Sequence, residues 1–180
     1  MKKILIPLTI ILLTACSMLD ISNTPTKKAE EFLNKYQILH EDVIKDLDNV
    51  LKKEQFSINN QEEYRELIKK QYKDLQYEIK ETKEDGNEAT ITAEIIVKDY
   101  TKTIKEAEIY KRTHIKEFYE EETYSDDKYK KYLIERLKEA KDKVTYQINL
   151  TAHKENGKWQ LDKITEEVED KILGIYDYGD

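Results

Sequence analysis

Cysteine is almost absent from this chain of 180 residues, in which Cys16 is the only one. A single thiol cannot form a disulfide framework, a cysteine-based zinc cluster or a redox pair within one chain. A cysteine that helps to fill a core would lie in an apolar stretch of the folded domain. Because Cys16 lies close to the N-terminus, the reason for its presence has to be sought there.

Glycine and proline are also scarce, with four Gly and two Pro. All-β sandwiches and barrels need many short turns that are rich in these residues, so the composition argues against them. Hydrophobic residues make up 38% of the chain, which is too apolar for a disordered protein. These proportions indicate one helix-rich domain that also contains some sheet.

Positive charge is in the minority, because 31 basic residues stand against 38 acidic ones and give a formal net charge of −7. An acidic surface is repelled by the phosphate backbone of nucleic acids. We therefore expect no nucleic-acid partner.

Residues 1–15 have the features of an export signal. Lys2 and Lys3 precede an apolar run at 4–13, which is shorter than the roughly 20 residues that span a bilayer. The run ends in a motif of four residues, Leu13, Thr14, Ala15 and Cys16. This motif resembles the bacterial lipobox, although the resemblance covers only the leader. It implies that a signal peptidase cleaves before Cys16 and that the cysteine carries diacylglycerol.

Lipidation of Cys16 predicts where the protein is located. Two or more acyl chains hold a protein firmly on a membrane. We therefore predict a lipoprotein with a fatty-acid (palmitate) anchor at the extracytoplasmic face of the cell membrane, exposed at the cell surface. Abundant Lys, Ile and Tyr indicate a low-GC Gram-positive host. In a Gram-negative host the outer membrane is expected, because Ser17 stands where inner-membrane lipoproteins carry aspartate.

The sequence predicts four segments along the chain. Residues 1–15 are the signal peptide, 16–23 a lipidated tether, 24–173 a single α+β domain and 174–180 a tail. The tether has no regular pattern of charge or hydrophobicity, which is typical of a flexible linker.

Hydrophobic periodicity predicts two helical regions near the start of the domain. Apolar residues recur every three to four positions over 29–51, which predicts a long helix with a break near His40. A second helix is predicted to open at Asn60, with Glu63 placed to complete a capping box.

The period changes to two at 75–97 and again at 144–164, and each stretch contains a turn, at Gly86 and Gly157. Each stretch therefore predicts a β-hairpin with one buried face. Between them, 101–140 predicts a pair of helices, the second capped by Ser125. The predicted fold class is α+β, with helices packed on a curved four-stranded antiparallel sheet built from two hairpins.

A weaker resemblance concerns the whole domain. Pro25 precedes a helix that reads AEEFL at 29–33, the first hairpin contains DGNEATIT at 85–92, and the closing hairpin contains GKWQL at 157–161. These features resemble small lipoproteins with a nuclear-transport-factor-two-like (cystatin-like) fold. The resemblance implies a cone of sheet wrapped by helices.

No local motif indicates a catalytic or metal site. His40, His114 and His153 lack a His or Cys partner at metal-ligand spacing, although His114 with Glu117 or Glu120 would form a conceivable acid–base pair. The acidic stretch at 120–127 lacks the spaced ligands and central Gly of a calcium loop. We expect no metal and no cofactor.

Thirteen tyrosines are many for this length, and they offer the best candidates for a binding pocket. If the sheet curls, its concave face could carry a pocket with aromatic walls and hydroxyl tips. The alternative is that these rings fill the core at helical and strand spacing. The candidate pocket residues are Tyr36, Tyr77, Tyr110, Tyr132, Tyr146 and Trp159.

The sequence therefore favours an anchored, non-catalytic module that binds a small molecule, an envelope component or another protein. Two alternatives stay open. One is an enzyme that uses the interior of the cone, and the other is a structural or assembly protein of the envelope. Fold alone does not decide between them.

Overall fold

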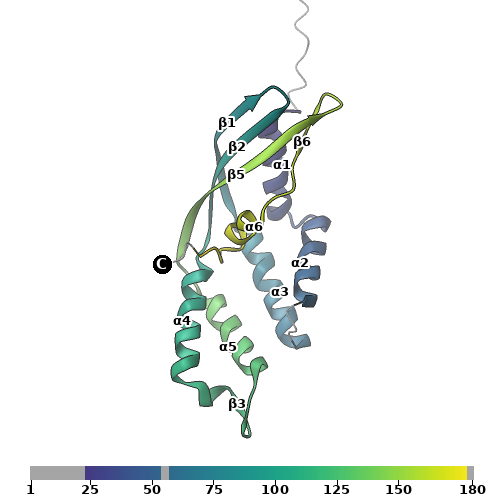
Figure 1. The fold of residues 1–180 in the computed structure, drawn as a ribbon. Coiled ribbons are helices and arrows are strands. Elements are labelled where there is room, and N and C mark those ends of the chain that lie inside the picture. Colours follow the sequence, from purple (N-terminus) through teal and green to yellow (C-terminus); the bar gives the residue numbers. More distant parts are fainter. Residues whose placement is uncertain (1–22, 54–56, 178–180) are drawn as a thin grey trace, which may run out of the picture.

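The computed structural model describes residues 23–53 and 57–177, and Figure 1 shows their arrangement. Four antiparallel strands form the main sheet in the order β1-β2-β5-β6. The strands are β1 (Gln76–Asp85), β2 (Glu88–Lys98), β5 (Lys143–Glu155) and β6 (Lys158–Leu161). β1 pairs with β2 and β5 pairs with β6 as hairpins, and β2 pairs with β5 between them. The predicted α+β fold with a sheet of two hairpins is confirmed.

Local backbone features shape the two hairpins. Gly86 (φ 62°) closes the first one, and Asn156 (φ 51°) with Gly157 (φ 78°) closes the second. Glycine and asparagine favour this left-handed region, which tight hairpin turns require. β1 also carries a register shift between Ile79 and Glu81. A bulge of this kind bends a strand and increases its twist, so it contributes to the curvature of the sheet.

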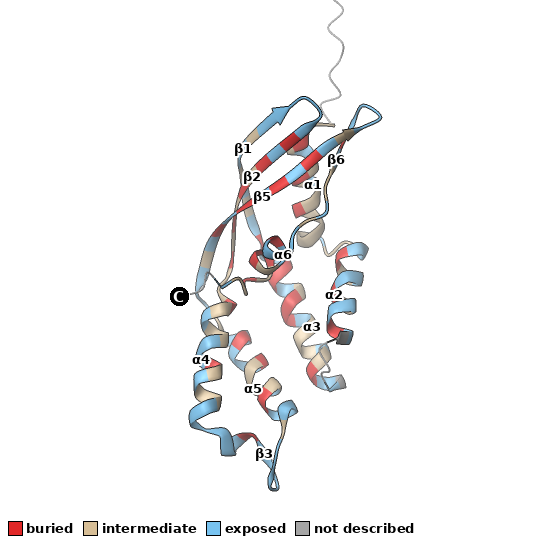
Figure 2. Cartoon of the chain, in the orientation of Figure 1, coloured by how far each residue is buried: buried red, intermediate tan, exposed pale blue. Residues whose placement is uncertain are grey.

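The sheet has one dry face and one open face. Every second residue of the two central strands is buried, and Figure 2 shows the resulting alternation along β2 and β5. These buried residues are Ala89, Ile91, Ala93, Ile95 and Val97 of β2, and Tyr146, Ile148, Leu150 and Ala152 of β5. Polar residues between them, such as Thr90 and Gln147, are exposed on the other face. Half-buried strands account for the period of two in the sequence.

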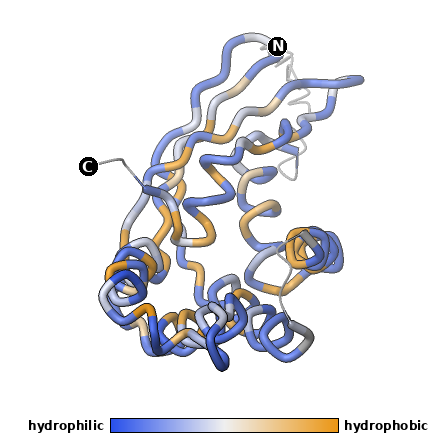
Figure 3. Tube along the Cα trace, turned by 60° about the horizontal axis from the view of Figure 1, so that its bottom comes forward, coloured by the Kyte–Doolittle hydropathy of each residue, from blue (hydrophilic) through white to orange (hydrophobic). Residues whose placement is uncertain are grey.

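Four helices form a layer against the dry face. They are α1 (Pro25–Gln37), α2 (Glu41–Lys53), α3 (Ile58–Lys73) and α6 (Glu166–Leu173). α1 and α6 lie on the sheet, α3 packs against both, and α2 packs against α3. The hydroxyls of Thr24, Ser57 and Thr165 cap the first turns of α1, α3 and α6. Along the helical turns of the chain, hydrophobic residues recur between hydrophilic ones (Figure 3), as expected for helices with one buried stripe.

The first two helices are separated by a sharp break, as the sequence predicted. Leu39 has a φ of 53°, and His40 lies between α1 and α2. The predicted start of the next helix was wrong. Ser57 caps α3 by accepting a hydrogen bond from the backbone N of Asn60, so the helix begins at Ile58. Asn60 instead donates its side-chain amide to α5, and no capping box forms there.

Residues 100–139 form a helical arm that projects away from the sheet (Figure 1). Its elements are α4 (Tyr100–Thr113), the 3₁₀ turn η1 (Ile115–Phe118), the two-residue strands β3 (Tyr119–Glu120) and β4 (Thr123–Tyr124), and α5 (Asp126–Glu139). α5 packs against α4 on one side and α3 on the other, so it joins the arm to the other described residues, which we call the body. The predicted helical pair is confirmed, including the cap at Ser125.

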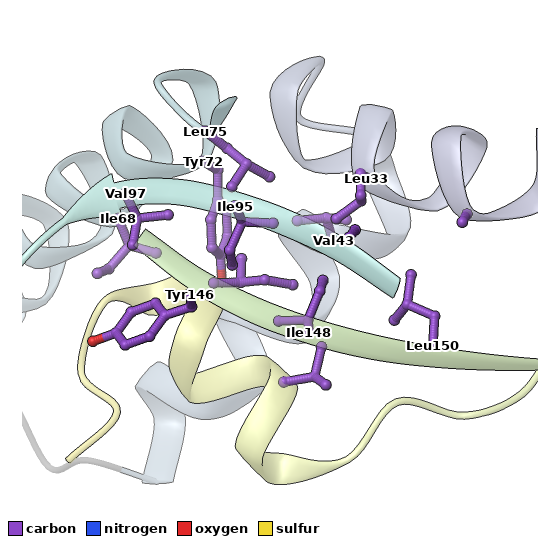
Figure 4. Packing of buried hydrophobic residues seen from close by; sticks show 14 of the residues in the cluster. Leu33, Val43, Ile68, Tyr72, Leu75, Ile95, Val97, Tyr146, Ile148 and Leu150 are labelled. Atoms are coloured by element: carbon purple, nitrogen blue, oxygen red, sulfur yellow. The ribbon is translucent and has the colours of Figure 1, made fainter. Parts of the chain in front are cut away.

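The body contains one continuous hydrophobic core (Figure 4). Leu33 of α1, Ile68 of α3 and Ile95 of β2 are each at most 1% exposed, and they belong to the same cluster of buried side chains. Burial of a large aliphatic side chain contributes about 1.5–3 kcal/mol. The cluster that joins the sheet to α1, α2, α3 and α6 is therefore the main source of stability.

The segment that follows α6 ties the body to the base of the arm. The Gly174 carbonyl accepts hydrogen bonds from the backbone N of Tyr100 (2.9 Å) and Thr101 (3.0 Å), at the first turn of α4. Tyr176 packs against the core and accepts a hydrogen bond from the Tyr146 hydroxyl. Residues 174–177, which the sequence assigned to a tail, therefore contact the domain.

Candidate functional site

The predicted lipidation motif, Leu13, Thr14, Ala15 and Cys16, lies outside the described residues. So does the predicted tether, apart from Asn23. The side-chain oxygen of Asn23 accepts a hydrogen bond from the Trp159 backbone N at 2.9 Å. The described chain therefore starts beside β6, near the end of the sheet where the hairpins turn (Figure 1). Within the described residues, no helix is both long and apolar enough to cross a bilayer.

Two of the six candidate pocket residues, Tyr146 and Trp159, lie in the core. Tyr146 is 2% exposed, and its hydroxyl donates to the Tyr176 carbonyl oxygen at 3.2 Å. Trp159 is 4% exposed, and Lys154 Nζ lies 4.5 Å from the centroid of its ring. Both side chains fill space between the sheet and its neighbours, which is the role that the alternative interpretation gave them.

Three further candidates are separated from one another. Tyr77 is half-buried on β1, and its hydroxyl donates to Asn34 Oδ1 of α1 at 3.0 Å. Tyr110 and Tyr132 belong to the arm, where their rings stack with centroids 5.0 Å apart. The six candidates therefore do not line one pocket. Tyr36 alone among them lines the groove described next.

A groove with a volume of about 300 Å³ lies between α1, α2, α3 and α6. Its floor consists of aliphatic side chains that include Val43, Leu47, Ile68 and Leu173. The backbone turns sharply at Leu39, and α2 packs against α3 beyond this turn. The groove thus belongs to the helical layer, whereas the concave face of the sheet is filled by the core.

Aromatic rings from two helices form the walls of the groove. α1 contributes Phe32 and Tyr36, and α3 contributes Tyr64 and Tyr72. Phe32 packs edge-on against Tyr36, with ring centroids 5.4 Å apart, and Tyr36 packs edge-on against Tyr72 at 4.9 Å. Such T-shaped contacts are favourable because the positive edge of one ring meets the negative face of the next. The rings hold one another in place without a ligand.

The hydroxyls of Tyr36 and Tyr72 are free to interact with a ligand. Neither forms a hydrogen bond to another described residue, and no polar side-chain atom of the described residues is both fully buried and without a partner. Both hydroxyls therefore remain in contact with solvent. Burial raises the pKa of Tyr36 and of Tyr72 because a phenolate would be poorly solvated there. They stay protonated and can donate a hydrogen bond as well as accept one.

Charged residues surround the opening of the groove. Lys35 forms an ion pair with Asp42 at 3.1 Å. Asp46 of α2, Glu169 of α6 and Lys163 are exposed and line the same groove. None of these three has an ion-pair partner among the described residues. The groove is therefore apolar inside and carries unneutralised charges at its rim.

The conceivable acid–base pair at His114 is not assembled. His114 Nδ1 lies 2.8 Å from Thr113 Oγ1, and Glu117 accepts a hydrogen bond from the Tyr110 hydroxyl at 2.8 Å. His153 Nδ1 lies 2.6 Å from Asp162 Oδ1 at the exposed edge of the sheet. Over the described part of the chain, no group of three or more His, Cys, Asp or Glu residues is placed to hold a metal ion.

Sequence reasoning missed most of the groove. Tyr64 and Tyr72 are eight positions apart, on the apolar face of the helix that the periodicity predicts, but they are not among the six candidate pocket residues. Asp46 and Glu169 gave no signal, because each is an ordinary polar residue at the edge of an apolar stripe. Only the packing of α2 and α6 around α1 and α3 brings their carboxylates to the same groove.

We compared the chain with family models, curated proteins and solved structures. No family model, no curated protein and no solved structure matches the chain.

Proposed function

We propose that the protein is a lipid-anchored, extracytoplasmic lipoprotein whose domain binds a small ligand in the groove between α1, α2, α3 and α6, without catalysing a reaction. The observation that carries the anchor is the order of features in the leader. Two lysines, an apolar run and the motif that ends at Cys16 follow one another as a lipoprotein signal requires. The groove supports the role in binding.

The nuclear-transport-factor-two-like relationship is part of this proposal. A bent antiparallel sheet with helices on one face supports it. The arm is inserted between the two hairpins, at the place where the sequence has its central helical pair. In this protein the ligand site is proposed for the helical layer, since core side chains fill the concave face of the sheet.

Binding is favoured over catalysis by the positions of the polar groups. Asp46 and Glu169 are exposed at the rim, and neither is enclosed with a second catalytic group as an acid–base site requires. No histidine lines the groove. Two protonated tyrosine hydroxyls and an apolar floor are typical of a site that orients a ligand.

The anchor is tested by replacing Cys16 with Ala in the full chain and expressing it in a bacterial host. We expect the wild-type protein to fractionate with membranes and to yield a diacylglycerol-modified Cys16 peptide by mass spectrometry. The variant is expected to lose the lipid and to accumulate with its leader attached or in the soluble fraction. Ser17→Ala is the matched control and should leave anchoring unchanged. A Cys16→Ala protein that still carries lipid at mature length would disprove the proposed anchor.

The binding role is tested by mass spectrometry of small molecules that co-purify with the protein. A ligand of the groove should co-purify with the wild-type chain and be lost from Tyr36→Ala, which removes one aromatic wall. Tyr132→Ala, which removes a ring of the arm, is the control. A ligand that is retained by Tyr36→Ala and lost from Tyr132→Ala would place binding elsewhere.

A further inference from the structure

We infer that the groove between α1, α2, α3 and α6 binds an organic cation, in which an ammonium group is attached to a small apolar body. This inference rests on the proposed binding function and specifies the class of ligand. It follows from three features of the described residues: the rings that line the groove, the two carboxylates beside them and the excess of unpaired carboxylates over unpaired lysines.

The aromatic walls suit a positive charge. Phe32, Tyr36, Tyr64 and Tyr72 all line the groove. The face of each ring carries the negative part of its quadrupole, so it attracts an ammonium group that lies within about 6 Å of the ring centroid. Several rings around one cavity are the usual arrangement for proteins that recognise quaternary ammonium groups.

Two carboxylates add negative potential at the same place. Asp46 projects from α2 and Glu169 from α6, and both line the groove. They act on the hydroxyls of both Tyr36 and Tyr72, whose pKa values they raise further after the effect of burial. Since each carboxylate acts on both hydroxyls, the negative potential extends over the aromatic part of the groove.

The lysines of the groove do not cancel this potential. Lys35 is already paired with Asp42 at 3.1 Å. Lys163 is exposed at the rim, and it is one ammonium against the two carboxylates of Asp46 and Glu169, none of which has an ion-pair partner among the described residues. The charges of the groove that are not already paired are therefore mainly negative.

The other ligand classes fit less well. An anion would enter beside two carboxylates that lack ion-pair partners among the described residues, so it would be repelled. A neutral molecule would remove water from these carboxylates and leave them without a new partner. The volume of about 300 Å³ lies at the lower end for ligand pockets, which points to a small molecule.

The test compares three probes of similar shape on the purified full chain by isothermal titration calorimetry. The probes are benzyltrimethylammonium, benzyl alcohol and phenylacetate, which are a cation, a neutral molecule and an anion. We expect the cation to bind about tenfold more tightly than benzyl alcohol, from the combined effect of the rings and two exposed carboxylates. Phenylacetate should bind more weakly than either. Raising the salt concentration should weaken binding of the cation alone.

A double variant, Asp46→Asn with Glu169→Gln, isolates the contribution of the carboxylates. Both side chains are exposed, so the fold is expected to tolerate the changes. The affinity for benzyltrimethylammonium should fall about fourfold and lose its salt dependence, with the rings supplying the rest of its preference, whereas benzyl alcohol should bind as before. Glu135→Gln removes an exposed carboxylate of the arm and serves as the control for net charge.

The outcomes separate this inference from the proposed function. Equal affinities for the cation and benzyl alcohol, or an unchanged affinity of the double variant for the cation, would overturn the choice of a cation and leave binding in the groove intact. Absence of binding for all three probes would overturn the inference together with the ligand-binding role. The lipid anchor would survive either result, since membrane fractionation tests it separately.

Discussion

The body and the arm differ in the side-chain contacts that fill their interiors. In the body, aliphatic side chains of the dry face of the sheet pack with those of four helices, and the resulting core is a single cluster. At the base of the arm, Tyr100 and Leu137 belong to that cluster, whereas the buried residues Ala107, Phe118, Tyr129 and Ile134 lie outside it. Aromatic contacts dominate there, and Phe118 packs against Tyr129 with ring centroids 5.4 Å apart. The arm therefore has a small interior of its own.

This difference indicates how tightly each region is held. The arm is joined to the body through α5, which packs on α3, through Tyr100 and Leu137, which belong to the core cluster, and through the hydrogen bonds between Gly174 and the first turn of α4. It also carries several exposed apolar residues, including Ile109 at 60% exposure. Regions with few buried apolar contacts open locally at a lower free energy than the rest of a protein. We expect the arm to open before the body unfolds.

The largest loss of stability is expected from a substitution that creates a cavity in the body. Ile91 is fully buried at the centre of β2, so Ile91→Ala should lower the free energy of unfolding by about 4 kcal/mol. Urea denaturation followed by circular dichroism measures this loss. Ile109→Ala, at an exposed position of the arm, is the control and should change stability by less than about 0.5 kcal/mol. A loss below about 1 kcal/mol for Ile91→Ala would contradict the assignment of the main core to the sheet.

A substitution at the junction between the body and the arm should lower the free energy of unfolding almost as much. Gly174 has a φ of +74°, and a Cβ atom there would lie only 2.1 Å from the Lys98 carbonyl oxygen and 2.7 Å from Gln71 Nε2. Gly174→Ala should therefore cost about 3 kcal/mol, from strain in the left-handed region and displacement of the backbone. Thermal unfolding measures the change.

A second glycine provides the control for that junction. Gly86 has a similar φ of +62°, but a Cβ atom would meet nothing within 4 Å. Gly86→Ala should cost about 1 kcal/mol, from the backbone conformation alone. Equal losses for the two variants would show that the close approach at Gly174 does not contribute.

A cavity in the arm should have a local effect. Phe118 is 4% exposed and contacts the rings of Tyr110, Tyr129 and Tyr132. Phe118→Ala should lower the free energy of opening of the arm by about 3 kcal/mol and leave the body nearly as stable as before. Hydrogen exchange of backbone amides separates the two regions. Faster exchange across β2 and β5 to the same extent as in α4 would mean that body and arm unfold as one unit.

The fold of the body was predicted well from the sequence, because a sheet and helices with one buried face require a regular spacing of apolar residues. Alternate burial along β2 and β5 gives a period of two, and the buried side of α1 gives apolar residues every three to four positions. The start of α3 was misplaced because both Ser57 and Asn60 are good capping residues. Nothing local shows that Asn60 is needed by α5, where it donates a hydrogen bond to Asp127 Oδ1 at 2.7 Å.

The candidate site was predicted less well, for a reason that is also physical. A tyrosine on an apolar face can fill a core, as Tyr146 does, or line a groove, as Tyr36 does. Both give the same periodicity, so the pattern cannot distinguish them. The groove depends on the break at Leu39 and on the packing of α2 and α6, which are properties of the tertiary structure.

The smallest changes in stability are expected from removing single tyrosine hydroxyls. One such hydroxyl in the body and one in the arm allow a direct comparison of the two regions. In the body, Tyr72 has a hydroxyl without a hydrogen-bond partner among the described residues, so Tyr72→Phe should change stability at pH 7 by less than about 0.5 kcal/mol. In the arm, the Tyr129 hydroxyl donates to Glu108 at 2.6 Å. Tyr129→Phe should cost about 1 kcal/mol. Urea denaturation of both variants at pH 7 measures the difference.

At alkaline pH, the Tyr72 hydroxyl should change the stability of the protein, although it has little effect at pH 7. Burial raises the pKa of Tyr72 in the folded protein, so the folded state retains a proton that the unfolded chain releases. This contribution to stability is fully present below the unfolded pKa of about 10 and is lost as the pH rises above it. Between pH 7 and pH 11 the wild-type protein should thus lose about 1.4 kcal/mol more than Tyr72→Phe. Parallel losses in the two proteins would mean that the Tyr72 hydroxyl ionises freely in the folded state, and that the groove is more open to water than its packing implies.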